Sequence, residues 1–353
     1  MQLPETNVIH HCRFQDGMKE LPDGCAQLIV CDPPYFNIKG DFDFSLDWKE
    51  WLEMHEELAS ECHRVLAENG TLFIWGHAKR IAYQQVIFDK LFKLENSIVW
   101  EKVDAQTNRM APTDRMFAPV TERLLMYSKE GNSRAECANL RYKFETGKRR
   151  TEIMEPLVSY LIEEMERAGL TTADVNRITG TSMASRWFAR TSQWNLPTRE
   201  RYEQLRQAFN EASAGKYLKK EYEYLKKEYE YLKKEYEYLK KEYEELRRPF
   251  DNILKLTDVW RFSQESHITK NFDHETVKPE KLTRAMLLST TRPGALVVVP
   301  FAGAGTECAM AAREGRRFIG FEMDEKYVSI ASARCRPYLE GRQMSIMDAL
   351  ADG

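Results

Sequence analysis

The stretch ALVVVPFAGAGTECAMAAREGRRFIGFE, residues 295–322, contains the pattern that decides the fold. A short apolar run at 295–299 is followed by a glycine-containing loop, a helical pattern that begins TECAMAAREG, and a second apolar run at 317–322. Strands that alternate with helices are typical of a parallel α/β sheet. Because ligands bind to such sheets beyond the carboxyl ends of the strands, the loop at 300–306 is a candidate binding site.

The same alternation is present near the amino terminus. Short apolar strands are predicted at 27–30, 71–75, 98–100 and 124–127, with a helical pattern at 48–70 between the first two. In the carboxyl-terminal part, helices are predicted at 280–289 and from Glu325 onward. Each α/β segment is short for a sheet of its own, so we predict a single sheet assembled from both ends of the chain.

Composition excludes several classes of protein. The 353 residues are 42% hydrophobic and 30% charged, which allows a buried core and predicts two domains. There is neither an apolar run of roughly 18 residues nor an apolar amino-terminal signal. The seven cysteines form no CxxC pair, which argues against disulfides and a structural zinc site. We therefore predict a cytoplasmic protein with reduced thiols, no metal and no membrane partner.

A helical insertion is predicted at 149–213. The amphipathic pattern LVSYLIEEMERAG ends at Gly169, and two short helices follow on either side of Gly180, with Thr171 and Thr181 as expected N-caps. A last helix begins near Pro197. The pattern indicates a unit resembling a helix-turn-helix, and a plain helical bundle explains it equally well.

This insertion has a basic composition. Between residues 177 and 206 there are six arginines and two glutamates, an excess of four positive charges. Such a surface suits contacts to the phosphates and base edges of DNA. The candidate DNA-binding residues are Arg177, Arg186, Arg190 and Arg199. We expect Trp187, Phe188 and Trp194 to belong to the core of the unit.

A heptad-repeat helix is predicted at 214–249. The unit YLKKEYE recurs, with leucines at 218, 225, 232, 239 and 246. Tyrosines four positions after the leucines complete a Leu/Tyr stripe. We predict a continuous helix of about 45 Å from Lys216 to Leu246, ended by Pro249. The stripe is compatible with a spacer packed on a neighbouring helix, a coiled coil that joins two chains, or a ruler whose length depends on the number of repeats.

The segment CDPPY, residues 31–35, directly follows the first predicted strand. Two prolines remove backbone donors and leave carbonyls as acceptors, Asp32 adds a carboxylate, and Tyr35 adds a flat aromatic face. Together they form a socket for a planar ring that carries an amino group. Acceptors aimed at the hydrogens of that amine free its delocalised lone pair for attack. A tight turn with a buried aspartate is the alternative interpretation.

The segment PFAGAGT, residues 300–306, allows a ligand to approach the backbone and the amino terminus of the next helix. Glu322, at the end of the following strand, is placed to accept hydrogen bonds from ribose hydroxyls. The loop has neither a GxGxxG pattern nor a Walker lysine, so a nucleoside with an amino-acid tail is a more natural ligand than NAD or ATP.

Together, CDPPY, PFAGAGT and HETVKP at 274–279 resemble the motifs of amino-directed DNA methyltransferases that use S-adenosyl-L-methionine. DPPY precedes the glycine loop and a variable region lies between them, which resembles the β-class (permuted) arrangement. The resemblance covers about residues 10–130 and 255–340. It implies a Rossmann-like methyltransferase sheet.

We place the half with DPPY at 1–148 and the cofactor-binding half at 250–353, on either side of the two helical segments. The resemblance also implies individual roles. Asp32, Pro33, Pro34 and Tyr35 would hold and activate a flipped base. The implied cofactor-binding residues are Asp16, Thr276, Lys278, Pro279, Phe301, Gly303, Gly305, Thr306 and Glu322.

Among these residues, Asp16 would approach the cofactor adenine, and Thr276, Lys278 and Pro279 would lie beside its methionine end. The sequence departs from the family pattern at Val299, where many members carry an aspartate. Some of the hydrogen bonding around the glycine loop is therefore expected to differ.

DPPY, rather than SPPY, resembles the adenine branch of the family. We therefore predict a site-specific methyltransferase that acts on the N6 amino group of adenine in duplex DNA by base flipping. Methylation of cytosine N4 is the nearest alternative. A non-catalytic DNA-binding regulator, dimerised through the heptads, is the alternative of a different class. Expected partners are double-stranded DNA, a second copy of the chain and a cognate restriction endonuclease.

Overall fold

The chain forms two compact units, one made of residues 1–137 and 248–353 and the other of residues 138–247. The structure is a computed structural model, and it describes residues 5–36, 46–104, 115, 117–129, 138–213, 216–264 and 277–341. The predicted insertion at 149–213 and the predicted heptad segment at 214–249 thus share one unit. That unit begins near residue 138, because its first helix is longer at its amino end than the sequence pattern indicated.

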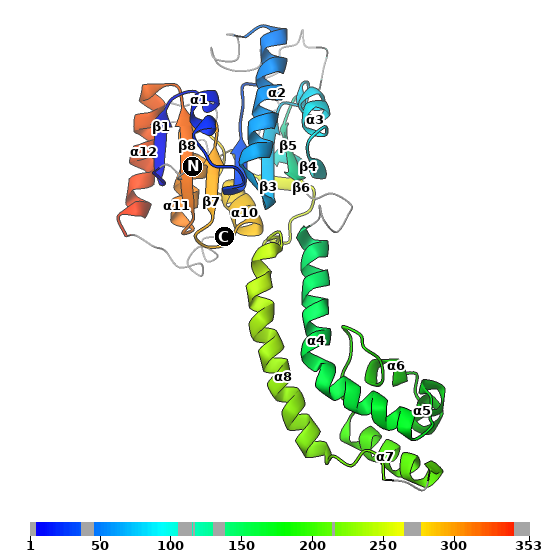
Figure 1. The fold of residues 1–353 in the computed structure, drawn as a ribbon. Helices are drawn as coiled ribbons and strands as arrows, with labels where there is room; N and C mark the ends of the chain where they lie inside the picture. Colours follow the sequence, from blue (N-terminus) through cyan, green and yellow to red (C-terminus); the bar gives the residue numbers. More distant parts are fainter. Residues whose placement is uncertain are drawn as a thin grey trace. The chain divides into compact units, whose positions relative to one another are not determined.

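The first unit contains an eight-stranded sheet with the order β1-β8-β7-β2-β3-β5-β4-β6 (Figure 1). The strands are β1 (Val8–His11), β2 (Ala26–Cys31), β3 (Leu66–Gly76), β4 (Lys93–Lys102), β5 (Thr121–Ser128), β6 (Val259–Phe262), β7 (Leu296–Val299) and β8 (Arg317–Glu322). β2 pairs in parallel with β7, with Leu28 opposite Val297 and Ile29 opposite Val298. The predicted single sheet built from both ends of the chain is confirmed.

One strand runs against the others. β5 is antiparallel to both β3 and β4, whereas the sequence predicted a parallel sheet. No helical pattern was predicted between β4 and β5, and strands that neighbour each other without a crossover helix pair antiparallel. β1 and β6 were not predicted; each has four residues and lies at an edge of the sheet.

Helices cover both faces of the sheet. The helices α1 (Phe14–Lys19), α2 (Trp48–Val65) and α3 (Ile81–Phe88) cover one face, and α10 (Glu280–Thr290), α11 (Thr306–Arg313) and α12 (Glu325–Leu339) cover the other. Successive residues of β2 alternate between the two cores: Leu28 and Val30 pack with α10–α12, while Ile29 and Cys31 pack with α1–α3. A strand buried on both faces explains the continuous apolar run in the sequence.

The second unit is entirely helical in its described residues. It contains α4 (Ala138–Arg167), α5 (Thr172–Thr179), α6 (Ala184–Trp187), α7 (Arg199–Ser213), α8 (Tyr222–Tyr243) and the 3-10 turn η3 (Glu244–Leu246). Thr171 caps α5 as predicted, in a capping box with Asp174, and Gly180 ends α5 in the left-handed conformation.

The helix after Gly180 differs from its prediction. α6 is four residues long and begins after Met183, so Thr181 is not its N-cap. Instead, the Thr181 hydroxyl accepts a hydrogen bond from the Met183 amide at 3.3 Å within the turn. Trp187, Phe188 and Trp194 are buried in the core of the unit, as expected.

The heptad helix starts later than predicted, at Tyr222 rather than Lys216. Leu218 has a φ of +50° and a fully buried side chain, and its amide donates to Glu164 Oε2 at 2.5 Å. Tyr202 donates to the carbonyls of Leu218 and Lys220 at 3.1 and 2.7 Å. Because these tertiary contacts hold the first repeat outside the helix, α8 has 22 residues and is about 33 Å long.

The Leu/Tyr stripe of α8 packs within its own unit. α8 lies beside α4 (Figure 1), with Leu225 fully buried and Tyr229 and Leu232 partly buried against the helical core. Tyr224, Tyr231 and Tyr238 do not belong to this stripe, and 58%, 68% and 68% of their surface is exposed. The stripe is therefore covered in part by α4, as expected for a spacer packed on a neighbouring helix.

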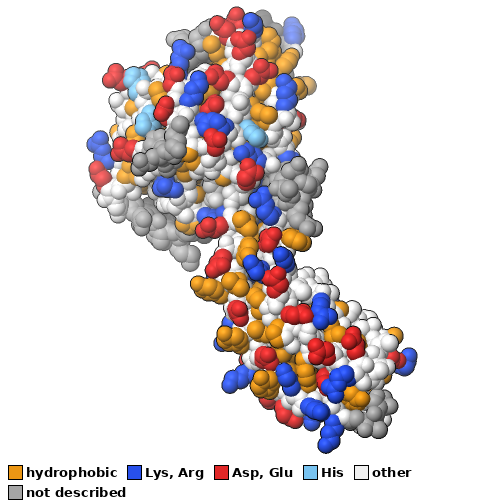
Figure 2. Space-filling view, in the orientation of Figure 1, with side chains coloured by type: hydrophobic (Ala, Val, Ile, Leu, Met, Phe, Trp, Pro, Cys, Tyr) orange, Lys and Arg blue, Asp and Glu red, His pale blue; other side chains and the backbone are white. Residues whose placement is uncertain are grey.

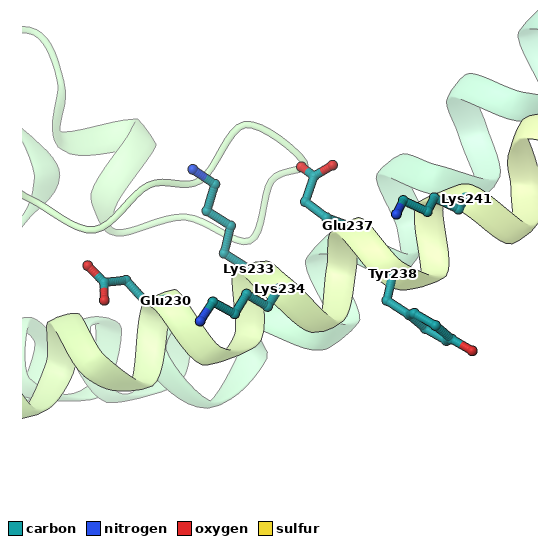
Figure 3. Close-up of a pocket in the computed structure, with 6 residues that line it drawn as sticks. All are labelled: Glu230, Lys233, Lys234, Glu237, Tyr238 and Lys241. Carbon is teal, nitrogen blue, oxygen red and sulfur yellow. The ribbon is translucent and has the colours of Figure 1, made fainter.

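The exposed side of α8 has a mixed character. Hydrophobic, basic and acidic side chains are interspersed over this unit (Figure 2). A surface hollow of about 430 Å³ on α8 (Figure 3) is lined by Glu230, Lys233, Lys234, Glu237, Tyr238 and Lys241. Its lysines and glutamates largely neutralise one another, and none of the candidate site residues lies there.

Burial predicts unequal contributions of two repeat leucines to stability. Replacing the fully buried Leu225 by alanine leaves a cavity and should cost about 2–5 kcal/mol. Leu239→Ala, at the equivalent position of a later repeat, should cost less because Leu239 is partly exposed. Urea unfolding of the two variants, followed by hydrogen exchange of α8 amides, measures the difference. Equal losses would contradict the packing described.

Candidate active site

The two principal sequence motifs lie at the same edge of the sheet. CDPPY extends from the carboxyl end of β2 and PFAGAGT from the carboxyl end of β7, and these strands are parallel neighbours. Two segments more than 260 residues apart are thereby brought to adjacent loops. A site shared by both motifs requires this placement.

Asp32, Tyr35 and Lys278 form a hydrogen-bonded cluster. Tyr35 donates its hydroxyl to Asp32 Oδ1 at 2.7 Å, and Lys278 Nζ donates to Asp32 Oδ2 at 2.7 Å and to the Tyr35 hydroxyl at 3.0 Å. The Lys278 side chain is 5% exposed and that of Asp32 is 22% exposed. The predicted residues Asp32 and Tyr35 are therefore brought together, and Lys278, which the family resemblance places beside the methionine end of the cofactor, contacts both.

A second ion pair extends this cluster into the sheet. Glu122, at the start of β5, receives a hydrogen bond from Lys102 Nζ at 2.6 Å and lies 3.4 Å from Lys278 Nζ. Its Oε2 also accepts from the Tyr35 hydroxyl at 3.4 Å. The sequence alone gave no clear chemical role to Glu122 or to the segment IVWEK at 98–102, which ends in Lys102. The sequence signal that could have identified this pair is a charged residue at the adjacent ends of two neighbouring strands, Lys102 in β4 and Glu122 in β5.

Burial and charge fix the protonation of this cluster. Burial raises the pKa of Tyr35 well above its usual value, and the negative charges of Asp32 and Glu122 raise it further. Burial lowers the pKa of Lys278, but the neighbouring Asp32 and Glu122 outweigh this effect and raise it overall. Near neutral pH Tyr35 is thus a neutral donor and Lys278 is a cation.

Aromatic side chains hold the DPPY segment in place. Trp51 Nε1 donates to the Pro34 carbonyl at 2.8 Å. The Trp51 ring stacks on Trp48 with centroids 5.2 Å apart, and the Arg80 guanidinium lies 5.2 Å from the Trp48 ring. On the other side, Lys278 Nζ lies 4.9 Å from the centroid of Trp75. The carbonyl of Pro34, expected as a free acceptor, is therefore used structurally.

The glycine loop is shaped by close approach of the chain. Gly305 has a φ of +74°, and a Cβ there would lie 2.6 Å from the Cβ of Ala331 in α12. Gly303 donates its amide to Glu322 Oε2 at 2.8 Å, and Asp324 donates its amide to Oε1 at 2.9 Å. Each Glu322 oxygen keeps a second lone pair, so the carboxylate can still accept from ribose hydroxyls.

The remaining predicted cofactor residues have different surroundings. Phe301 packs against Phe14 of α1 with ring centroids 5.1 Å apart. Thr306 is buried and its hydroxyl accepts from Arg334 at 2.8 Å. Pro279 is the N-cap residue of α10, and Asp16 is an exposed residue of α1. Thr276 lies outside the described residues.

Glu307, in the first turn of α11, is a buried carboxyl that the sequence did not single out. The residue is only 5% exposed, and its Oε1 has no hydrogen-bond partner among the described residues. Burial raises its pKa from 4.5 to about 7, aided by the charge of Asp32 and opposed by Lys278 and Arg334. Two positions after Gly305, this carboxyl borders both loops of the candidate site.

The four candidate DNA-binding arginines lie on the second unit. Arg177 pairs with Asp174, Arg190 with Glu155 and Arg199 with Glu223. Arg186 is exposed on α6. Exposed ion pairs of this kind contribute little to stability, so their arginines remain exchangeable with phosphates. Arg201, by contrast, donates to the Thr179 carbonyl at 2.9 Å and supports the end of α5.

The cysteines described by the structure are all free thiols; Cys137 lies outside the described residues. Cys31 and Cys62 have their sulfur atoms 3.7 Å apart in the core between β2 and α2. Within the described part of the chain, no helix has the length and apolarity needed to cross a membrane. Over the same residues, no three His, Cys, Asp or Glu side chains are grouped as metal ligands.

Comparison with known protein families gives a match over most of the chain. Residues 26–333 match the N6/N4 family described as DNA methylase. The chain belongs to this family. It is a DNA methyltransferase, S-adenosyl-L-methionine is its methyl donor, and DNA is its substrate. Both motif loops and the inserted helical unit fall inside the matched range.

Individual relatives are distant but match over nearly the full length. The DNA adenine methyltransferase YhdJ of Escherichia coli (strain K12) is 23% identical over 333 residues, covering 94% of this chain and 83% of the relative. The type II methyltransferase M1.MboII of Moraxella bovis is 22% identical over 335 residues, covering 93% and 96%. Both relatives therefore match most of this chain and most of their own length.

Comparison with solved structures gives matches that cover almost the whole chain. The PvuII DNA methyltransferase, which is cytosine-N4-specific, has a TM-score of 0.50 at 12% identity, covering 99% of this chain and 92% of its own. A DNA modification methylase from Thermus thermophilus, in complex with S-adenosyl-L-methionine, gives a TM-score of 0.48 at 18% identity, covering 96% and 98%. The sheet assembled from both chain ends is a DNA methyltransferase fold.

The raised pKa of Glu307 predicts a pH-dependent stability. The folded state holds the Glu307 proton more tightly than the unfolded state, so wild-type stability falls as pH rises from about 4.5 to about 7. The shift corresponds to about 3 kcal/mol at most. Glu307→Gln should therefore exceed the wild type in urea-unfolding free energy at pH 8 and equal it at pH 4.5.

A matched control is Glu314→Gln, at the other end of α11, where the carboxyl pairs with Arg284 at 2.6 Å. That variant should lose stability at pH 8. A Glu307→Gln variant with the same pH profile as the wild type would show that the carboxyl does not carry this burial penalty.

Proposed function

We propose that the enzyme transfers the methyl group to the N6 amino group of adenine in duplex DNA, at a specific site and after flipping the base. The single observation that supports this most is the Asp32–Tyr35 pair at the carboxyl end of β2, beside the glycine loop of β7. A relative named as a DNA adenine methyltransferase matches 94% of the chain. The DPPY sequence resembles the adenine branch.

In this proposal the DPPY segment holds the flipped base. Asp32 and the Pro33 carbonyl accept hydrogen bonds from the amine, Pro34 keeps the backbone rigid, and the Tyr35 ring stacks on the base. When both amine hydrogens are hydrogen-bonded to acceptors, the nitrogen lone pair is less delocalised into the ring. The Asp32 carboxylate also stabilises the positive charge that the nitrogen gains. As the N–C bond forms, the bond between sulfur and the methyl group would break and leave a neutral thioether, and the amine would then give up one proton to water. Trp51, which fixes the Pro34 carbonyl, keeps this segment rigid.

The cofactor would be held at the glycine loop, with S-adenosyl-L-methionine supplying an electrophilic methyl group on its sulfonium. Glu322 would accept from the ribose, and Gly303 and Gly305 would give the loop the turn that places the nucleoside beside Phe301. Thr306, Pro279, Thr276 and Asp16 complete the proposed set. The free lone pairs of Glu322 fit a nucleoside ligand.

Cytosine N4 is the second candidate target. It carries the same kind of exocyclic amine, and the socket chemistry applies equally to both bases. The fold is shared with an enzyme described as cytosine-N4-specific. The identity of the methylated base is therefore the first property to determine.

The proposed chemistry predicts the product and the effect of Asp32. Incubation with labelled cofactor and mixed-sequence duplex should yield N6-methyladenine, identified by mass spectrometry of the nucleosides. Asp32→Ala should lower kcat by about 100-fold or more while the cofactor still binds. Asp258→Ala, an exposed carboxylate of the same unit, is the control and should keep the wild-type rate. N4-methylcytosine as the product would replace the adenine assignment.

The helical unit would supply DNA recognition. Its exposed arginines Arg177, Arg186, Arg190 and Arg199 would contact phosphates or base edges around the target. A cognate restriction endonuclease belongs to the same proposal, because one relative is named a type II methyltransferase. A homodimer rests on the heptad repeat alone.

Phosphate contacts predict a change in salt dependence. Arg186→Ala should weaken DNA binding and reduce the slope of log K against log salt concentration by about 0.9, since one counterion fewer is released. Arg336→Ala, an exposed arginine of α12, is the matched control and should leave the slope unchanged. Fluorescence anisotropy of a labelled duplex at several salt concentrations measures both variants. Identical slopes for Arg186→Ala and the wild type would exclude Arg186 from the interface.

A further inference from the structure

Lys278 occupies an unexpected position in the candidate site. Its ammonium donates to Asp32 and to the Tyr35 hydroxyl at 2.7 and 3.0 Å, in a residue that is only 5% exposed. The rings of Trp75 and Tyr35 lie 4.9 and 5.4 Å from Nζ. The ammonium thus has the acceptors and the aromatic surroundings that the proposed socket offers to the amino group of a base.

A lysine in this position conflicts with methyl transfer. An amine nitrogen that donates to Asp32 Oδ2 beside the Tyr35 hydroxyl needs the same space as Nζ. The nitrogen also gains positive charge as its bond to the methyl group forms, and a cation in contact would oppose that charge. The raised pKa keeps Lys278 protonated, so it does not remove the conflict by acting as a neutral base.

Glu307 offers the displaced ammonium a second position. Its buried Oε1 has no hydrogen-bond partner among the described residues, a costly arrangement for a carboxyl group. Glu307 is close enough to Lys278 for each charge to shift the pKa of the other. An ammonium that approached Glu307 would satisfy this oxygen and stabilise its ionised form.

We propose that Lys278 is an exchangeable counter-ion. In the empty site its ammonium takes the place of the target amino group on Asp32 and Tyr35, and when the base enters it moves to Glu307. Lys278 thereby keeps Asp32 paired between turnovers, and Glu307 is the positioning residue that draws the cation away from the reacting nitrogen. The inference rests on the proposed transfer to an exocyclic amine and holds for adenine or cytosine.

A double-mutant cycle tests this exchange, using the full-length enzyme at pH 8 and the base that the wild type methylates. Glu307→Gln removes the second position, so Lys278 competes with the base and kcat/KM for DNA should fall about tenfold. The Kd for S-adenosyl-L-methionine, measured calorimetrically, should change by less than about twofold. In a Lys278→Met background, Glu307→Gln should lower kcat/KM by less than about twofold, because no cation needs to move.

Each other outcome overturns the exchange. Equal losses from Glu307→Gln in both backgrounds would make Glu307 act without Lys278. Weaker cofactor binding in Lys278→Met, with unchanged DNA parameters, would place Lys278 with the cofactor, as its sequence context suggests. If Lys278→Met does not fold, an unchanged kcat/KM in Glu307→Gln alone rejects the proposal. A wild type that methylates no DNA would instead reject the proposed function.

Discussion

The parallel pairing of β2 with β7 is the constraint on which the site depends. It is one of three places where amino-terminal and carboxyl-terminal strands pair in the sheet, the others being β1 with β8 and β4 with β6, and it is the one that carries both motifs. Loops that leave neighbouring parallel strands at the same end must face a common space, so this pairing puts DPPY beside the glycine loop. The helical unit interrupts the sequence between these strands without interrupting the sheet, which explains how an insertion of this size is accommodated.

Buried charge is the second feature that organises the site. Asp32, Glu122 and Glu307 are countered by Lys278 and Lys102, and most of these groups are almost fully buried. Such an arrangement does not maximise stability, because desolvating several charges costs about as much as their attraction returns. The desolvation penalty is clearest at Glu307, because its Oε1 has no hydrogen-bond partner among the described residues. Buried charges that do not maximise stability are best explained by a reaction that requires charged groups at this edge of the sheet.

Much of the sheet was predictable because its signal is local. Apolar runs identified β2, β7 and β8 almost to the residue, and the order of the motifs indicated that the two ends share a site. The antiparallel direction of β5 was indicated by the missing helical pattern between β4 and β5, whereas the position of Lys278 was not predictable, because it depends on contact between segments far apart in sequence. Lys278 lies next to a proline at the start of α10, and nothing in that local pattern says which loop its side chain reaches.

The heptad segment shows how tertiary contacts override a strong local pattern. Seven-residue periodicity predicts that Leu218 continues the helix as Leu225 does, since their repeats are nearly identical. Instead, Glu164 and Tyr202 bind the backbone around Leu218, and its side chain fills the core next to α4 and α7. An isolated helix gains only a few tenths of a kcal/mol per favourable side-chain pair, whereas burying a leucine gains about 1.5–3 kcal/mol. Leu225 is buried in the same core from within the helix, so the difference lies in the backbone: α8 begins only after the segment held by Glu164 and Tyr202, and the repeat alone does not set its first residue.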